Sequence, residues 1–171
     1  MDLQQYIRDI PDWPKEGILF RDITPLLADP EAFAAAVDAL SAGFTGTGVE
    51  YVAAVEARGF IFGAAVAEKL GAGFVPIRKK GKLPWQTESV TYDLEYGTDT
   101  LEVHCDAVKS GAKVLMVDDL LATAGTMAAA CELVEKIGGQ VTGIVFLIEL
   151  ADLGGRQKIA GYEVTSIISY E

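Results

Sequence analysis

Four short apolar runs that alternate with amphipathic segments constrain the fold of this chain more than any other feature. The runs are YVAAV at 51–55, GFVPI at 73–77, VLMV at 114–117 and VTGIVFLIEL at 141–150. Runs with so few polar residues are typical of strands buried on both faces of a sheet, and helices between such strands predict parallel connections. We therefore expect an α/β fold, with a doubly wound, mainly parallel sheet.

Turn and capping residues mark the helices between the runs. Asp29 and Pro30 stand before AFAAAVDAL as an N-cap and a first-turn proline, which predicts a helix start. A second helix is expected over 59–71, closed by Gly71, and a third over 126–137, followed by two glycines. Because no linker, repeat or low-complexity tract interrupts this pattern, we expect residues 1–171 to form a single domain.

The segment between the second and third runs has a different pattern. Apolar and polar residues alternate over 90–96 and over 101–104, on either side of a turn expected at 97–99. This period of two predicts an antiparallel hairpin attached to the parallel core. Its polar positions include His104, which we interpret as a satisfied surface histidine.

A polar loop, RKKGKLPWQTE, is expected over 78–88, just before the hairpin. It gathers four of the chain's cations, namely Arg78, Lys79, Lys80 and Lys82. An isolated cluster of this kind favours a solvated loop without a specific role. Gly81 and Pro84 also fit a mobile stretch that could close over an anionic ligand.

Charge and composition disfavour several classes of protein. The chain has 25 acidic and 14 basic residues, a formal net charge of -11, which opposes binding to nucleic acid and to anionic membranes. No apolar stretch approaches the roughly 20 residues that span a bilayer. MDLQQYIRDI shows no secretory pattern, so we expect a cytoplasmic protein. Cys105 and Cys131 are expected to be reduced, inert thiols.

Two adjacent carboxylates, Asp118 and Asp119, follow the 114–117 run directly. Like charges at one strand tip repel each other and resist desolvation, so a ligand or solvent has to surround them. The small residues of ATAGT at 122–126 then lead into a helix, whose positive end and free N–H groups favour phosphate. An ordinary tight turn would use the same small residues. The upstream carboxylates favour a ribose phosphate, which needs acceptors for its hydroxyls and donors for its phosphate.

With these motifs in place, the chain resembles the type I phosphoribosyltransferases, and among them the enzymes that act on adenine. The resemblance rests on VLMVDDLLATAGT together with FRDITPLL, EARGFIFG, RKKGKLP, YDLEYG and the terminal SYE. It implies transfer of ribose 5-phosphate from phosphoribosyl pyrophosphate to adenine, giving AMP and pyrophosphate, with Mg²⁺ as cofactor and a homodimer as the assembly. It also implies a small N-terminal hood at 1–28 and a flexible lid at 78–104.

The resemblance further implies roles for residues around the sugar and its phosphates. Asp118 and Asp119 would hold the ribose hydroxyls near a hydrated Mg²⁺ that no side chain binds directly. Arg58 would contact pyrophosphate, beside a non-proline cis peptide, with Arg78 and Lys82 contributing from the lid. The 5-phosphate would be bound by Ala122, Thr123, Ala124, Gly125 and Thr126. Because family members usually have glycine at the position of Ala124, we expect a backbone conformation there that tolerates a Cβ.

A second set of roles concerns the base. The resemblance implies that Phe20 stacks on adenine, although its pattern alone fits a core phenylalanine equally well. Glu95 would stabilise or exchange the proton at N7, with Glu102 and Glu56 as weaker candidates. The remaining contacts implied with the ligand are those of Leu19, Arg21, Tyr96 and Leu150.

Three alternatives compete with this interpretation. Enzymes for hypoxanthine and guanine resemble the chain but have an aspartate where it has Ala122. A regulatory protein could bind phosphoribosyl pyrophosphate without turning it over, although such relatives usually carry a nucleic-acid-binding domain. A flavodoxin-like or methyltransferase domain would not respond to phosphoribosyl pyrophosphate with magnesium.

Overall fold

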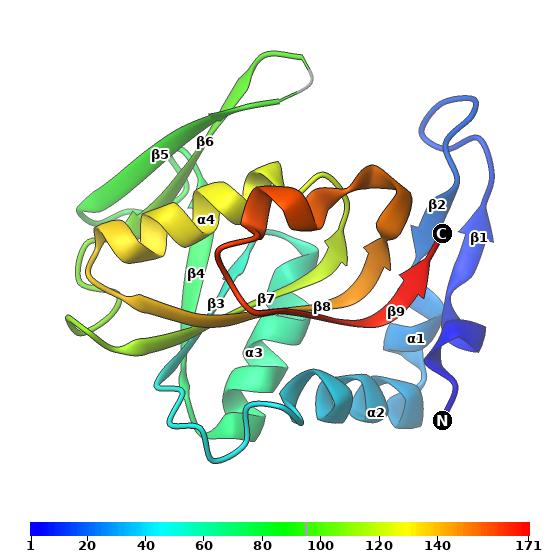
Figure 1. The fold of residues 1–171 in the computed structure, drawn as a ribbon, viewed down its shortest axis with the longest axis horizontal. Coiled ribbons are helices and arrows are strands. Elements are labelled where there is room, and N and C mark those ends of the chain that lie inside the picture. Colours follow the sequence, from blue (N-terminus) through cyan, green and yellow to red (C-terminus); the bar gives the residue numbers. More distant parts are fainter. Residues whose placement is uncertain (95) are drawn as a thin grey trace.

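One central sheet with helices on both faces organises the chain in the computed structural model, which describes residues 1–94 and 96–171 (Figure 1). Its seven strands lie in the order β5-β6-β4-β3-β7-β8-β9. The strands β4, β3, β7, β8 and β9 are parallel neighbours, which confirms the predicted fold class. Their bounds are β3 Tyr51–Val55, β4 Gly73–Lys79, β5 Thr87–Asp93, β6 Thr98–His104, β7 Lys113–Leu121, β8 Gln140–Leu150 and β9 Val164–Tyr170.

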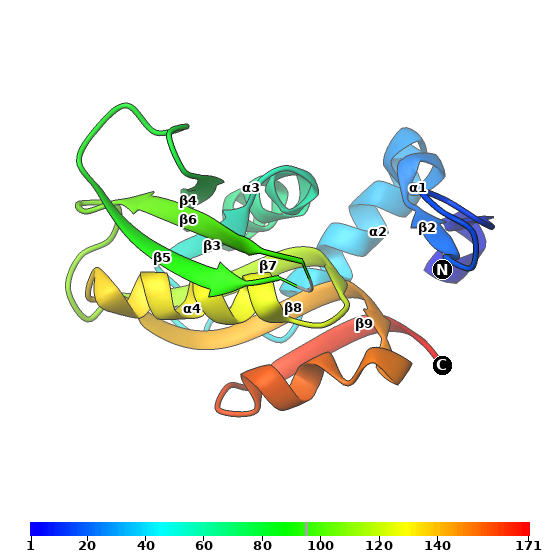
Figure 2. The ribbon, with the colours of Figure 1, turned by 90° about the horizontal axis from the view of Figure 1, so that it is seen from above.

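Helices cover the two faces of this sheet unequally (Figure 2). α2 (Pro30–Ser41) and α3 (Arg58–Leu70) pack on one face with the short α1 (Thr24–Ala28), while α4 (Gly125–Lys136) packs on the other. Each predicted helix is present within a residue of its expected start, and the Asp29 side chain caps α2 by accepting from two backbone N–H groups. Within the described residues no helix is long and apolar enough to cross a membrane.

The predicted hairpin is present as β5 and β6, and β6 also pairs antiparallel with β4, so the hairpin extends the main sheet. The predicted turn at 97–99 is wrong, because Thr98 and Asp99 belong to β6 and lie opposite Asp93 and Tyr92. The predicted loop at 78–88 is also too long at both ends. Arg78 and Lys79 extend β4, since pairing with β6 continues that strand past its buried part.

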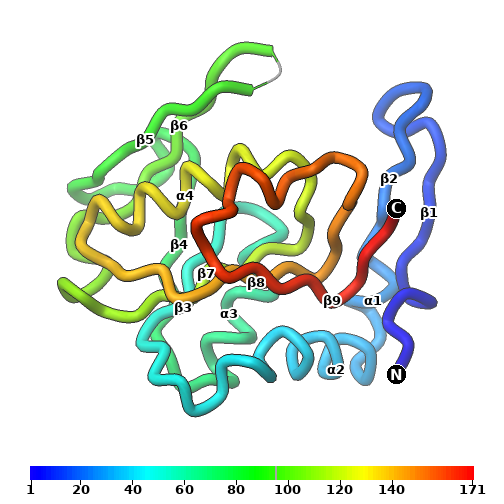
Figure 3. Tube along the Cα trace, in the orientation of Figure 1, coloured from blue at the N-terminus to red at the C-terminus, as the bar shows by residue number. Residues whose placement is uncertain are grey.

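A two-stranded antiparallel sheet, β1 (Arg8–Ile10) with β2 (Phe20–Asp22), lies apart from the main sheet near the N-terminus. The Cα trace runs back to this region at its end, so that β9 and the C-terminus lie beside β2 (Figure 3). The Arg21 guanidinium carbon lies 3.7 Å from the centre of the Tyr170 ring, a cation–π contact that joins β2 to β9. Short 3₁₀ turns complete the chain: η1 (Leu3–Tyr6), η2 (Ala151–Leu153) and η3 (Gly155–Ile159).

Strand β7 runs further than its apolar run predicts. Asp118 and Asp119 were expected just beyond the strand, but β7 continues to Leu121 because β8 pairs with it throughout. On the other side, the pairing of β7 with β3 ends at Met116 opposite Ala53. The two strands therefore separate just before the carboxylates, as ligand sites in open parallel sheets require.

Candidate active site

A cavity of about 280 Å³ opens at the carboxyl ends of β3 and β7, where these strands separate. It brings together the predicted residues Arg58, Asp118, Asp119 and the whole segment 122–126. Their neighbours in the wall include residues that sequence analysis did not assign, namely Val55, Gly59, Leu120, Met127 and Phe146. The carboxylates and the turn at 122–126, the phosphate turn, thus share one cavity. Arg58 at the start of α3 also reaches this cavity, although α3 and α4 lie on opposite faces of the sheet.

The two carboxylates of this cavity differ in their surroundings. Burial, followed by the adjacent charge of Asp119, raises the pKa of Asp118 well above its usual range. Asp118 keeps some exposure at the cavity wall, and its Oδ1 accepts a hydrogen bond of 2.8 Å from the Asp119 amide. Asp119 forms an ion pair with the Arg58 guanidinium through its buried Oδ2. The Arg58 cation therefore compensates the buried charge of Asp119.

Glycine at position 59 allows α3 to start against the carboxylates. A Cβ on Gly59 would lie 2.7 Å from Asp118 Oδ1, a distance that real side chains do not adopt. The peptide bond between Glu56 and Ala57 is cis, which confirms the expectation drawn from the resemblance. Arg58 begins α3 and points its guanidinium at Asp119.

The expectation for Ala124 is wrong. Ala124 has φ 62° and ψ 8°, the left-handed conformation that glycine adopts without cost. It precedes α4 as the N-cap residue, and its methyl group is buried, with 7% of the residue exposed. The left-handed conformation is needed because the chain has to turn from β7 into α4 while its N–H groups face the cavity.

Ala124→Gly is expected to leave the free energy of unfolding nearly unchanged, within about 0.5 kcal/mol. The left-handed alanine costs about 1–2 kcal/mol, and its relief offsets the lost methyl burial and the extra freedom of glycine in the unfolded chain. Ala130, buried in the middle of α4, is the matched control. Ala130→Gly is expected to cost about 2 kcal/mol. Urea denaturation of both variants checks this, and equal losses would contradict the conformation at 124.

The residues predicted for the base lie beside the cavity and outside its wall. The Arg58 guanidinium carbon lies 5.3 Å from the centre of the Phe20 ring, and Trp13 packs edge-on against the same ring at 4.5 Å. Phe20 is only half-buried, so it is not the core phenylalanine of the alternative interpretation. Leu19 is 44% exposed, and Leu150 ends β8 opposite Tyr170, which the Arg21 guanidinium contacts.

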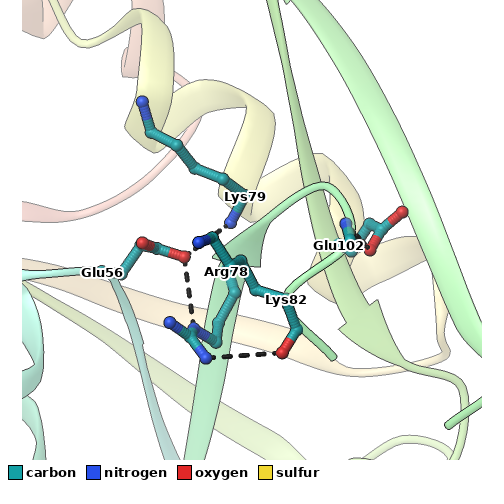
Figure 4. A network of polar contacts seen from close by, with 6 residues as sticks. Glu56, Arg78, Lys79, Lys82 and Glu102 are labelled. Carbon is teal, nitrogen blue, oxygen red and sulfur yellow. Dashed lines mark hydrogen bonds and ion pairs between the residues drawn. The ribbon is translucent and has the colours of Figure 1, made fainter. Parts of the chain in front are cut away.

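The predicted cations divide into paired and unpaired side chains. Arg78 Nε donates to Glu56 Oε1 at 3.2 Å, and the Lys79 amide donates to the same oxygen at 2.9 Å (Figure 4). The Lys79 ammonium pairs with Asp99 at 3.0 Å, whereas Lys80 and Lys82 have no ion pair among the described residues. Neither Arg78 nor Lys82 lines the cavity, although Glu56, which Arg78 contacts, does.

The structure places the residues predicted for proton transfer, and the alternatives to them, in different surroundings. Glu95 lies outside the described residues, and its neighbour Tyr96 is 82% exposed and away from the cavity wall. Glu102 is buried and accepts from the Gly81 amide at 3.0 Å, so it is engaged in holding the loop. The interpretation of His104 as a satisfied surface residue is wrong, because its Nε2 is buried and has no hydrogen-bond partner among the residues that the structure describes.

Tyr92 is a site residue that the sequence pattern did not reveal. Its hydroxyl lies 3.1 Å from the Thr126 hydroxyl, in the first turn of α4, and so links the hairpin to the presumed phosphate turn. In the sequence it is only one apolar position of an alternating strand. Predicting the role of Tyr92 would require knowing which strand packs against α4.

Tyr92→Phe is expected to raise KM for phosphoribosyl pyrophosphate about two- to tenfold, the equivalent of one hydrogen bond, with little change in kcat. The hydroxyl orients Thr126 and does not itself reach the cavity, so Tyr92 is a positioning residue. Tyr162→Phe is the matched control, because Tyr162 donates to Glu135 at 3.0 Å on the same helix but remote from the cavity. Steady-state kinetics of both variants decide, and equal effects would contradict the assignment.

The donor set fits a hydrated Mg²⁺ better than a metal held by protein ligands. Among the described residues no group of three or more His, Cys, Asp or Glu side chains could hold a metal ion. Asp118 and Asp119 offer carboxylate oxygens in the cavity wall, where Asp119 is also paired with Arg58. Such oxygens suit a hard cation that keeps its waters and is bound mainly through ligand phosphates.

Comparisons with known proteins agree with this geometry. The family model described as phosphoribosyl transferase domain matches residues 27–170. The adenine phosphoribosyltransferase of Kosmotoga olearia is 57% identical over 170 residues, covering 99% of this chain and 100% of that one. A crystal structure of adenine phosphoribosyltransferase from Thermoanaerobacter pseudethanolicus superposes with a TM-score of 0.95 at 53% identity, covering 99% of this chain and 98% of that one.

A third relative was solved with ligands. The adenine phosphoribosyltransferase of Saccharomyces cerevisiae, complexed with adenine and an imino-altritol bisphosphate, has a TM-score of 0.92 at 39% identity, over 97% of this chain and 96% of that one. Both the sequence relatives and the solved structures thus cover nearly the whole chain. With the cavity, the paired carboxylates and the phosphate turn, they establish that this chain belongs to the phosphoribosyltransferase family, among its adenine phosphoribosyltransferases.

Proposed function

We propose that this chain transfers ribose 5-phosphate from phosphoribosyl pyrophosphate to adenine, giving AMP and pyrophosphate, a reaction of purine salvage. The observation that carries the proposal is the single cavity in which Asp118 and Asp119 face the 122–126 turn. A sugar phosphate presents hydroxyls, which need acceptors, and a phosphate, which needs N–H donors. Relatives that are more than half identical over the full length are named adenine phosphoribosyltransferase.

In the proposed reaction, N9 of adenine forms a bond to the anomeric carbon as the bond from that carbon to pyrophosphate oxygen breaks. The electron pair of the broken bond leaves with pyrophosphate, and the base passes its N7 proton to the carboxylate assigned to that position, Glu95, or to water. The sugar is oxocarbenium-like at this point, so positioning and charge stabilisation supply most of the rate acceleration. Asp118 and Asp119 hold the ribose hydroxyls, Arg58 stabilises the growing charge of pyrophosphate, and 122–126 fix the 5-phosphate.

Mg²⁺ belongs to the same proposal as a substrate-bound cofactor near Asp118 and Asp119. When bound, it neutralises phosphate charge and orients the pyrophosphate. The carboxylates orient the ribose hydroxyls from their fixed place in β7, and nearby positive charge opposes the burial that raises the pKa of Asp118.

At the base end, we assign stacking on adenine to Phe20, edge contacts to Leu19 and Arg21, and the opposite wall to Leu150. The contact of Arg58 with the Phe20 ring supports this assignment, because it places an aromatic face next to the pyrophosphate-binding cation. Ala122 has no side-chain acceptor for N7 of a purine, which favours adenine over oxopurines. Glu95 is proposed to serve N7 instead.

The lid at 78–104 is proposed to bring Arg78, Lys82, Glu95 and Tyr96 over the bound ligand. Arg78 donates to Glu56, which lines the cavity, and this contact supports a lid that starts at the cavity rim. The hood at 1–28, a homodimer and a cytoplasmic location are part of the same proposal and rest on the family resemblance.

The deciding experiment is incubation with labelled adenine, phosphoribosyl pyrophosphate and Mg²⁺, with hypoxanthine and guanine in parallel. AMP is expected as the only nucleotide product. IMP or GMP at a comparable rate would contradict the preference for adenine. Tight binding of phosphoribosyl pyrophosphate with no nucleotide formed would identify a binding protein instead of an enzyme.

A further inference from the structure

The 3₁₀ turn η3 lies directly against the outer side of the phosphate turn. A Cβ on Gly155 would lie only 2.2 Å from the carbonyl oxygen of Ala122, so glycine is required for this contact. Arg156 anchors the same turn to the sheet through two hydrogen bonds of 2.7 Å to Glu149, and Ile159 is 1% exposed in the core beneath α4. The position of η3 relative to the phosphate turn is therefore fixed by packing.

Lys158 projects from this anchored turn toward the start of α4. Its Nζ lies 3.9 Å from the point where a Cβ on Gly125 would be. Lys158 lines a second hollow, of about 380 Å³, together with Asp93, Leu94, Thr123, Gly125 and Thr126. Three of these residues belong to the 122–126 turn, so the ammonium adjoins that turn in a hollow that Asp118 and Asp119 do not line.

The Lys158 ammonium is exposed beside the N-terminus of α4, whose partial positive charge repels it, and the Asp93 carboxylate lines the same hollow. Lys158 has no ion pair and no hydrogen bond within the described residues, whereas Arg156 of the same turn is fully engaged. A phosphate dianion on the 122–126 turn would reverse this repulsion, since it would lie between two positive groups.

We propose that Lys158 is a further binding residue for the 5-phosphate of phosphoribosyl pyrophosphate and AMP. This proposal rests on the proposed function, because it takes residues 122–126 as the phosphate site. The backbone N–H groups of the turn hold the phosphate from below, and Lys158 supplies a full charge from the side. The phosphate and the pyrophosphate of one substrate are then bound by different cations, Lys158 and Arg58.

Isothermal titration with ribose 5-phosphate and, separately, with pyrophosphate tests this division. Lys158→Met is expected to raise Kd for ribose 5-phosphate about three- to tenfold, as for one partly exposed charged contact, and to leave Kd for pyrophosphate within about twofold. In turnover, KM for phosphoribosyl pyrophosphate should rise with kcat nearly unchanged. Lys109→Met is the matched control, an exposed lysine in the turn before β7 whose loss changes the net charge equally, and it should alter neither Kd.

Three outcomes would overturn the proposal. Lys158→Met could bind ribose 5-phosphate as tightly as the wild type, or it could lose both anions equally, which would indicate a general charge effect. Asp93→Asn could also reproduce the effect of Lys158→Met, which would mean that the lysine serves this neighbouring carboxylate. Absence of AMP formation by the wild type would instead refute the adenine reaction, while ribose 5-phosphate binding would still test Lys158.

Discussion

Replacing Asp118 and Asp119 together by asparagine is expected to lower kcat/KM for phosphoribosyl pyrophosphate about 10²- to 10⁴-fold, which corresponds to two hydrogen bonds to charged groups at about 1.5–3 kcal/mol each. Both carboxylates lie in the cavity wall, and Asp119 is paired there with Arg58. Asparagine keeps the shape but removes the charge that the ribose hydroxyls would bind. Steady-state kinetics with saturating adenine measure the effect.

Replacing Asp118 alone by asparagine is expected to stabilise the fold, because Asp119 then keeps its ion pair with Arg58. Because burial raises the pKa of Asp118, the folded state binds a proton that the unfolded state has already released between the unfolded value of about 3.9 and the raised folded value. The free energy of unfolding therefore falls as pH rises through this interval. Asp118→Asn removes the ionisable group, so its free energy of unfolding at neutral pH should exceed that of the wild type and lose this pH dependence.

Opposite signs for activity and stability make the result specific. A variant that is inactive because it is misfolded would be less stable, and thermal denaturation followed by circular dichroism would detect this. Asp106→Asn, at an exposed position outside the cavity, serves as the control for the change in net charge. Wild-type kinetics in the double variant would eliminate the role of these carboxylates in sugar binding.

Arg58→Ala is expected to lower kcat/KM for phosphoribosyl pyrophosphate about 10²- to 10³-fold, the usual effect of removing a group that stabilises developing charge. KM for adenine should change by less than about threefold, because the base is assigned to Phe20 and the neighbouring main chain. Pyrophosphate binding should weaken in parallel. A selective loss of adenine affinity would contradict the assignment of Arg58 to the leaving group.

The stability of this variant gives a second, independent check. Arg58 pairs with Asp119, so its removal leaves a buried carboxylate without a cation, at an expected cost of about 1–3 kcal/mol. Arg58→Ala combined with Asp119→Asn should recover most of that stability without recovering activity. Arg58→Lys, which keeps the charge but loses the guanidinium geometry, should be intermediate in both measurements.

The elements whose signals are local were predictable from the sequence. Asp29 caps α2, Gly71 ends α3 at φ 65°, and four of the five parallel strands contain the four apolar runs, while β9 was not predicted. These features depend on capping, backbone freedom and hydrophobic periodicity, which neighbouring residues determine among themselves. The site residues Arg58, Asp118 and Asp119 were predictable for a related reason, since strand ends in parallel sheets face the ligand.

Errors arose where a distant segment decided the local structure. Strand β7 includes both carboxylates because β8 continues to pair with it, and β4 includes Arg78 because β6 does. Ala124 is left-handed because the chain must join a strand and a helix fixed elsewhere. His104 occupies a polar position in the alternating pattern of the hairpin. Its Nε2 is nevertheless buried.

By itself, the sequence determined the α/β class, the order of the elements, and the pairing of acidic residues with a phosphate-binding turn, because each follows from interactions between residues close in the chain. Only the tertiary structure decided that Arg58 contacts Asp119, that Tyr92 contacts Thr126, and that Lys158 approaches the phosphate turn. Such contacts join segments distant in sequence, and they depend on how strands pair and helices pack across the whole sheet, which no local pattern encodes.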